Sequence, residues 1–174
     1  NLRAARAHDG GRVVLLDGGD LFQGTLESNL NEGAAVIDAY NALQYDAVAV
    51  GNHEFDFGPV GPRATPHDAT DNPRGALFAR AADAHFPFLS ANVVDAATGV
   101  TPVTPNVHAT TMLTVDGIRI GIIGLSTEST PHTTIAANFR GLEARPLEAA
   151  VLREAASLRA AGATIVFVAA HAGG

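Results

Sequence analysis

Three apolar segments of this chain end in residues of the kinds that bind metal ions. Residues 13–16 lead through two glycines to Asp20, residues 48–50 lead to the run Gly51-Asn52-His53-Glu54-Phe55-Asp56, and residues 164–170 lead to His171. Unbroken apolar runs of this length are typical of strands that are covered on both faces. Because α/β sheets bind ligands beyond the carboxyl ends of their strands, we expect these polar side chains to meet at one site.

The rest of the sequence predicts an α/β domain. Hydrophobic periodicity predicts strands at 12–16, 46–50, 87–93, 110–115, 118–124 and 164–170, and helices at 34–44, from Asn72 to about 85, and from Pro146 to a stop at Gly162. Asp116-Gly117 predicts a tight hairpin, so part of the sheet system is antiparallel. Segments rich in turn or polar residues predict loops at 57–72, 96–105 and 126–140, and the first eight residues resemble the end of a helix.

Composition excludes several classes of protein. The chain has 174 residues, of which 47% are hydrophobic and 17% are charged, which is enough for one globular domain with a core. A net charge of −7 argues against a basic surface that binds nucleic-acid polymers. The lack of cysteine excludes disulfides, thiolate zinc sites and cysteine nucleophiles. No apolar run approaches the ~20 residues that a membrane-spanning helix needs.

Two motifs carry a resemblance to a known family. The blocks Gly19-Asp20-Leu21-Phe22-Gln23-Gly24 and Gly51-Asn52-His53-Glu54-Phe55-Asp56 look like signature blocks of the calcineurin-like metallophosphoesterases. Together with Ser90-Ala91-Asn92 and the final Ala170-His171-Ala172-Gly173-Gly174, they resemble the 5′-nucleotidase and 2′,3′-cyclic phosphodiesterase branch. The resemblance covers nearly the whole chain apart from 57–72 and 96–106. It implies a layered α-β-β-α sandwich with mixed parallel and antiparallel sheets.

The resemblance also implies a role for each matching residue. Asp20 would bridge two divalent metal ions (Mn, Zn, Fe, Co or Mg), and Asn52 and His171 would bind the second of them. Asn52 would also touch the substrate phosphate. His53 would face the substrate, where it would stabilise charge on the phosphoryl oxygens or protonate the leaving oxygen, and Asp56 would orient it. These roles agree with two-metal hydrolysis, in which paired cations clamp the attacking and leaving oxygens.

Two blocks of the family pattern have no counterpart here: an Asp-x-His pair before the opening helix, and a Gly-His-x-His-like block after the last strand. We therefore expect residues 1–174 to be a single but partial catalytic domain, without the separate domain that supplies nucleoside recognition. This polypeptide alone should bind metal weakly or at one site and turn over little substrate. The resemblance further implies a periplasmic or extracellular location.

For several neighbouring residues, a supporting role is the simpler interpretation. Glu54 is expected to be structural rather than a ligand. Asp17 is expected to hydrogen-bond the glycine turn. Asn92, at a strand end, either lines the substrate site or forms a turn. Gln23 and Gly24 would shape the loop beside the bridging aspartate. The remaining histidines are expected at the solvated surface: His8, His67, His85, His108 and His132.

The favoured function is two-metal hydrolysis of phosphate esters by an activated water, with nucleoside 5′-monophosphates or related nucleotides as substrates. One alternative keeps the site and changes the ester to a cyclic nucleotide, a sugar nucleotide or a sulfur ester. Another is a non-catalytic binding relative. The intact set of Asp20, Asn52, His53 and Asp56 argues against that loss of function. The sequence leaves the oligomeric state open.

Overall fold

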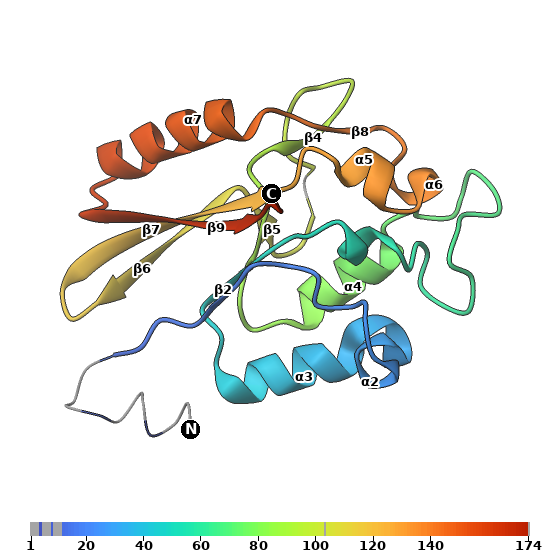
Figure 1. The fold of residues 1–174 in the computed structure, drawn as a ribbon, viewed down its shortest axis with the longest axis horizontal. Coiled ribbons are helices and arrows are strands. Elements are labelled where there is room, and N and C mark those ends of the chain that lie inside the picture. The colour runs from blue at the N-terminus through green and yellow to red at the C-terminus, as the bar shows by residue number, and fades with distance from the viewer. Residues whose placement is uncertain (1–3, 5–7, 9–11, 103, 174) are drawn as a thin grey trace.

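Two sheets packed face to face form the centre of the structure, and helices cover their outer faces (Figure 1). The structure is a computed structural model that describes residues 4, 8, 12–102 and 104–173. The helix expected at residues 1–8 therefore lies largely outside the described residues. The arrangement confirms the predicted α/β class and its α-β-β-α layering.

The first sheet is parallel throughout and has the order β1-β2-β3-β5, with β1 Leu16–Asp17, β2 Ala47–Ala49, β3 Phe88–Leu89 and β5 Val107–His108. The second sheet has the order β6-β7-β9, with β6 Thr110–Val115, β7 Ile118–Ser126 and β9 Ile165–His171. Its β6–β7 pair is antiparallel and its β7–β9 pair is parallel. A small antiparallel pair joins β4 Val93–Asp95 to β8 Leu142–Ala144.

Helices α3 Ala34–Leu43 and α4 Gly75–Asp83 cover the first sheet, and α7 Leu147–Ala160 covers the second. Within residues 12–102 and 104–173, the other helices are short: α2 Leu26–Asn29, η2 Leu30–Gly33, η3 His53–Phe55, α5 Thr130–Thr133 and α6 Ala136–Phe139. Among the described residues, no helix is long and apolar enough to cross a membrane.

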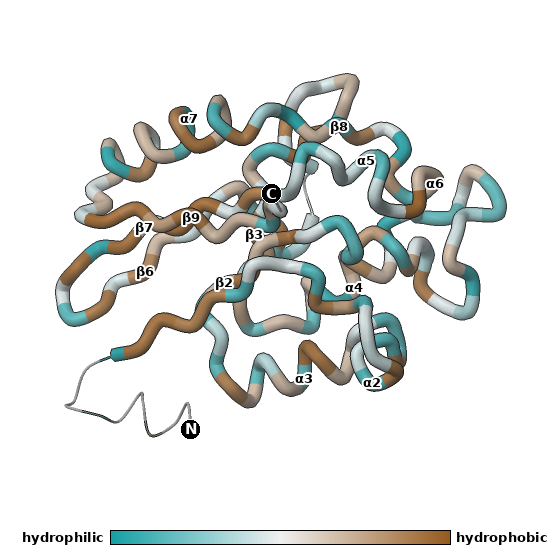
Figure 2. Tube along the Cα trace, in the orientation of Figure 1, coloured by the Kyte–Doolittle hydropathy of each residue, from teal (hydrophilic) through white to brown (hydrophobic). Residues whose placement is uncertain are grey.

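Alternation along β2 explains how the layers stack. Val48 and Val50 are buried against the side chains of α3 and α4, whereas Ala47 and Ala49 face the second sheet. Because alternate residues of a strand point to opposite faces, a strand covered on both sides is apolar throughout. In Figure 2 brown runs along β7 and β9 and alternates with teal along α3 and α7. β7 is buried over most of its length. β9 was also expected to be covered on both faces, but it lies at the edge of its sheet and leaves Ile165, Phe167 and Val168 exposed. Between the sheets, Ala47 and Ala49 pack with the larger Leu89, Ile120 and Ile122.

Two predicted strands are shorter or more divided than expected. The strand expected at 12–16 is regular only at Leu16–Asp17, because its partner β2 begins at Ala47. The strand expected at 87–93 divides into β3 and β4. Its middle residue Ala91 donates its N–H to Gly124 O of β7, so the chain leaves the first sheet at that point.

The segments predicted as loops contain further elements. β5 lies just beyond 96–105, and α5 and α6 lie within 126–140, which is therefore not a plain loop. β8, a further strand that the pattern did not predict, follows it. These elements have few residues, too few to show a period in the sequence. The helix expected to begin at Asn72 begins at Gly75. Asn72 instead accepts the Arg74 N–H in a turn that precedes the helix.

The hairpin prediction is confirmed. β6 and β7 are antiparallel, and the connecting Asp116 and Gly117 have φ values of 49° and 82°. A type I′ turn, whose twist matches that of the flanking strands, requires positive φ at both central residues. The predicted helices at 34–44 and 146–161 are confirmed as α3 and α7.

Gly124 of β7 lies directly against Leu89 of β3 in the other sheet. A Cβ at this position would lie 2.2 Å from Leu89 Cβ and 2.3 Å from Leu89 O. We predict that Gly124→Ala lowers the free energy of unfolding by about 1–3 kcal/mol, because the backbone of β3 has to shift. Urea unfolding followed by circular dichroism measures this. Gly173→Ala, where a Cβ meets no atom within 4 Å, is the matched control and should change stability by less than about 0.5 kcal/mol.

Candidate active site

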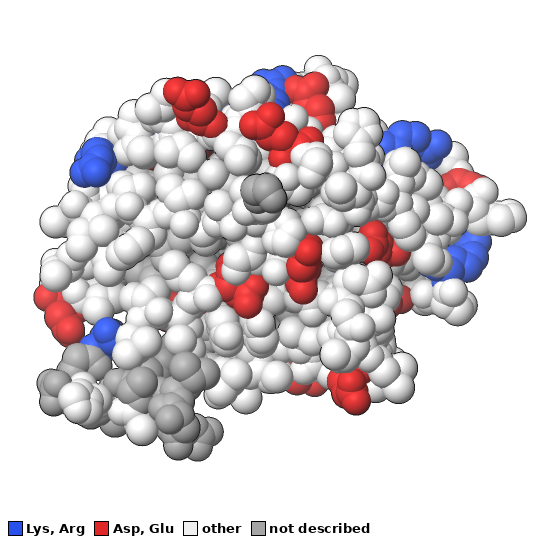
Figure 3. Space-filling view, in the orientation of Figure 1, with Lys and Arg blue, Asp and Glu red and all other residues white. Residues whose placement is uncertain are grey.

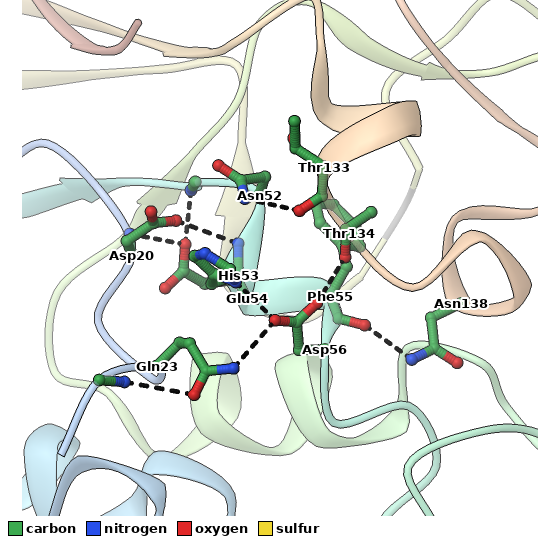
Figure 4. Close-up of polar contacts among 12 residues, drawn as sticks. Asp20, Gln23, Asn52, His53, Glu54, Phe55, Asp56, Thr133, Thr134 and Asn138 are labelled. Carbon is green, nitrogen blue, oxygen red and sulfur yellow. Dashed lines mark hydrogen bonds and ion pairs between the residues drawn. The ribbon is translucent and has the colours of Figure 1, made fainter. Parts of the chain in front are cut away.

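The structure brings together polar residues from the carboxyl ends of β1, β2 and β9. Figure 4 shows those that follow β1 and β2. His171 is the last residue of β9, and its Nε2 lies 3.1 Å from Asp20 Oδ2 and 3.0 Å from Asn52 Oδ1. Asp20 also accepts the backbone N–H of His53 at 3.0 Å. Side chains from three strands therefore converge at the carboxyl edge of the sheets, as the sequence predicted.

Tight packing of two turns gives Asp20 its position. Asp20 has a φ of 64°, in the left-handed region that non-glycine residues rarely adopt. The preceding Gly19 has a φ of 100°, and a Cβ there would lie 2.7 Å from Gly51 N. The glycines thus let the turn after β1 lie directly against the turn after β2.

Glu54 joins these two turns. Its side chain is buried, with 1% of its surface exposed, and accepts three backbone hydrogen bonds. Oε2 accepts from Gly51 N at 2.5 Å and from Asp20 N at 2.9 Å, and Oε1 accepts from Leu21 N at 2.5 Å. Burial raises the pKa of Glu54 to about 7, against the opposing effect of these donors. Glu54 is therefore committed to the backbone, which fits the supporting role expected for it.

His53 and Asp56 form a pair on the same turn. His53 Nδ1 lies 2.5 Å from Asp56 Oδ2. Partial burial acts to lower the pKa of His53, but the hydrogen bond to Asp56 and the negative charges of Asp20, Asp56 and Glu54 together raise it. The carboxylate fixes the orientation of the imidazole and favours its protonated form, which suits a group that acts as an acid.

Asp56 is itself held by two further side chains. Gln23 Nε2 donates to its Oδ2 at 3.3 Å, and Thr134 Oγ1 donates to its Oδ1 at 2.8 Å. The adjacent Thr133 accepts a hydrogen bond at its backbone oxygen from Asn52 Nδ2 at 3.0 Å. This contact leaves the carbonyl oxygen of Asn52 to face the other candidate ligands.

Sequence reasoning missed the contribution of residues 127–139. Thr133 and Thr134 lie in a polar stretch whose composition is that of a surface loop. Two buried residues, Asn138 and Phe139, anchor it, and the apolar Phe139 was the available signal of contact with the core.

Asn92 and Asp17 serve the frame of the site. Asn92 is buried and exchanges hydrogen bonds with the backbone of Ser126, and it also donates to Arg145 O. This geometry favours a structural role for Asn92 over the lining of a substrate site. Asp17 accepts the Gly19 N–H at 2.8 Å, as expected for a residue that fixes the glycine turn. The five remaining histidines are exposed, as predicted: His8, His67, His85, His108 and His132.

The donor atoms of Asp20, Asn52 and His171 fit a divalent cation. Carboxylate and amide oxygens and an imidazole nitrogen suit manganese, zinc, iron and related ions. His171 Nδ1 lies 3.2 Å from Gly18 O, and a partner of this kind orients a ligating histidine. Within the described residues, however, no three His, Cys, Asp or Glu side chains group as ligands, so a second cation needs further donors. On the face in Figure 3, acidic side chains cross the middle and basic ones lie at the periphery.

Comparison with known proteins gave relatives, although no family model matches the chain. The 5′-nucleotidase of Vibrio cholerae is 40% identical over 129 residues, which are 74% of this chain and 20% of that protein. The chain thus spans about a fifth of the length of the curated relatives it matches.

Solved structures share the fold over the whole chain. The 5′-nucleotidase precursor of Thermus thermophilus superposes with a TM-score of 0.77 and 28% identity, covering 98% of this chain and 30% of that one. The calcineurin-like phosphoesterase YfkN of Bacillus subtilis gives a TM-score of 0.75 over 99% of this chain and 52% of that one. Its identity of 21% shows a likeness of fold alone.

The role of Glu54 generates a stability prediction. Glu54→Gln should lower the free energy of unfolding by about 1–3 kcal/mol, because the new amide group cannot accept from every backbone N–H that now points at the carboxylate. Chemical denaturation at neutral pH measures the change. Glu148→Gln, on the exposed face of α7, supplies the control. Equal stability of the two variants would contradict the conclusion that Glu54 joins the two turns.

Proposed function

We propose that the chain belongs to the calcineurin-like phosphoesterases, in the branch that contains the 5′-nucleotidases, and that it carries part of the active site of a metal-dependent phosphoesterase. The observation that carries the proposal is the convergence of Asp20, Asn52 and His171 beside the His53–Asp56 pair. This arrangement combines a cation site with a hydrogen-bonded acid, which is the combination that ester hydrolysis at phosphorus uses.

The proposed substrates are nucleoside 5′-monophosphates or related nucleotides. This choice of substrates is supported by the similar proteins, which are named 5′-nucleotidases. The same site would also serve a cyclic nucleotide, a sugar nucleotide or a sulfur ester, and a screen of such esters distinguishes these substrates. An acidic face disfavours nucleic-acid polymers as partners. The proposal includes a periplasmic or extracellular location, as the family resemblance implies.

Asp20, Asn52 and His171 are the residues that would hold the metal ions, with Asp20 as the bridge. Bound divalent cations would supply positive charge to the phosphoryl oxygens and acidity to a water. Asn52 is turned toward the ligands by its bond to Thr133 O. Because Asp56 occupies His53 Nδ1, the other ring nitrogen, Nε2, is available to donate a hydrogen bond or a proton to the substrate.

Substitution of His53 should lower turnover without changing metal binding. In the protein expressed from its complete coding sequence, His53→Ala should lower kcat by about 10²–10⁴-fold, the usual contribution of a positioned acid. Its metal content should stay close to that of the parent, which elemental analysis of the purified protein measures. His132→Ala, at an exposed histidine, is the control. Loss of metal in the His53 variant would show that its role is misassigned.

Asp20 should instead govern metal binding. Calorimetric titration of residues 1–174 with Mn²⁺ should give at most one weak site, since the described residues offer three donor side chains. Asp20→Ala should abolish that heat, whereas the exposed Asp83→Ala should not. Two tight sites in the parent chain, or unchanged binding in the Asp20 variant, would contradict this assignment.

A further inference from the structure

Residues 130–139 hold the turn that carries the candidate acid. Thr133 O accepts from Asn52 Nδ2 at 3.0 Å, and Thr134 Oγ1 donates to Asp56 Oδ1 at 2.8 Å. Figure 4 shows these two contacts on neighbouring sides of the same turn. Two consecutive residues of one segment therefore fix both a candidate metal ligand and the carboxylate of the histidine pair.

Buried contacts anchor this segment. The fully buried Asn138 donates from Nδ2 to Phe55 O at 2.7 Å and to Ala64 O at 2.9 Å. Phe139 packs edge-on against the Phe55 ring, with the ring centroids 5.0 Å apart. Because the segment is attached to the core just beyond Thr134, the position of the Thr134 hydroxyl is set by packing and not by a free loop.

The Thr134 hydroxyl decides how the Asp56 carboxylate is turned. Both other contacts of that carboxylate, from His53 and Gln23, are made at Oδ2, and the Gln23 contact is exposed and 3.3 Å long. The torsion that rotates a carboxylate is soft, so one well-placed donor at Oδ1 has a large effect on its orientation. Since Asp56 accepts a hydrogen bond from His53 Nδ1–H, the plane of the carboxylate sets the direction of the imidazole.

We propose that Thr134 is a positioning residue that acts through Asp56 to aim the His53 imidazole at the substrate. The inference builds on the proposed function, because it concerns the group assigned there as the acid. It predicts that the effect of Thr134 on turnover exists only while His53 is present.

A double-mutant cycle tests this dependence in the protein expressed from its complete coding sequence, loaded with Mn²⁺ and assayed on a nucleoside 5′-monophosphate. Thr134→Val removes the hydroxyl and keeps the shape, and should lower kcat about tenfold, as expected for a hydrogen bond to a charged group. KM should change by less than about twofold, because the substrate is bound by other groups. In the His53→Ala background the same substitution should change kcat by less than about twofold.

Two matched variants accompany the cycle. Thr134→Ser retains the hydroxyl and should restore kcat to within about twofold of the parent. Thr114→Val makes the same substitution at an exposed threonine of β6 and should leave kcat unchanged.

A measurement that needs no turnover supports the cycle. In NMR spectra of the same proteins, the His53 Nδ1–H resonance should be protected from exchange in the parent and in Thr134→Ser, and should broaden in Thr134→Val. If the parent hydrolyses no phosphate ester, the proposed function fails while this spectrum still tests the positioning.

Three results would overturn the inference. The first is an equal loss of kcat from Thr134→Val with and without His53, which would indicate a general structural effect. The second is an unchanged kcat in Thr134→Val. The third is a His53 Nδ1–H resonance that behaves alike in the Thr134→Val and Thr114→Val variants.

Discussion

The Glu54 carboxylate is the contact on which the arrangement of the site depends. It bonds the backbone of Gly51 in one turn and of Asp20 and Leu21 in the other, in a place where water cannot substitute for it. A charged acceptor that serves several buried N–H groups is stronger than a neutral one. Through it, the ends of two strands that pair only over a few residues keep a fixed separation, and the unusual backbone at Asp20 is maintained.

A second set of contacts lies around Glu54 and orients side chains of the turn instead of its backbone. Thr133, Thr134 and Gln23 each reach the 52–56 turn from outside it. The two sets of hydrogen bonds differ in what they fix. The buried bonds to the backbone fix where the turn lies, and the partly exposed bonds to side chains fix which way its polar groups point.

Much of this site was predictable because its signals are local. The apolar runs that end at Asp20, Asn52 and His171 place those residues at one sheet edge by a rule of α/β topology. The helices α3 and α7 and the Asp116-Gly117 hairpin were also predictable, since each has a clear period or turn signature. Short elements such as β5, β8 and α5 were not, because a few residues carry no period. The contact of Thr134 with Asp56 was hidden for another reason: the two residues lie on different segments, and only the fold brings them together.

The contacts within the site join residues that are far apart along the chain. The bonds of His171 to Asn52 and to Gly18 span 119 and 153 residues, and that of Thr134 to Asp56 spans 78. Closing such long loops costs chain entropy before any contact compensates for it, so non-local contacts of this kind slow folding. The strand that ends at His171 also follows every other described element in chain order. During synthesis, the site is therefore assembled after those elements have emerged, and its integrity reports that the two sheets have closed on each other.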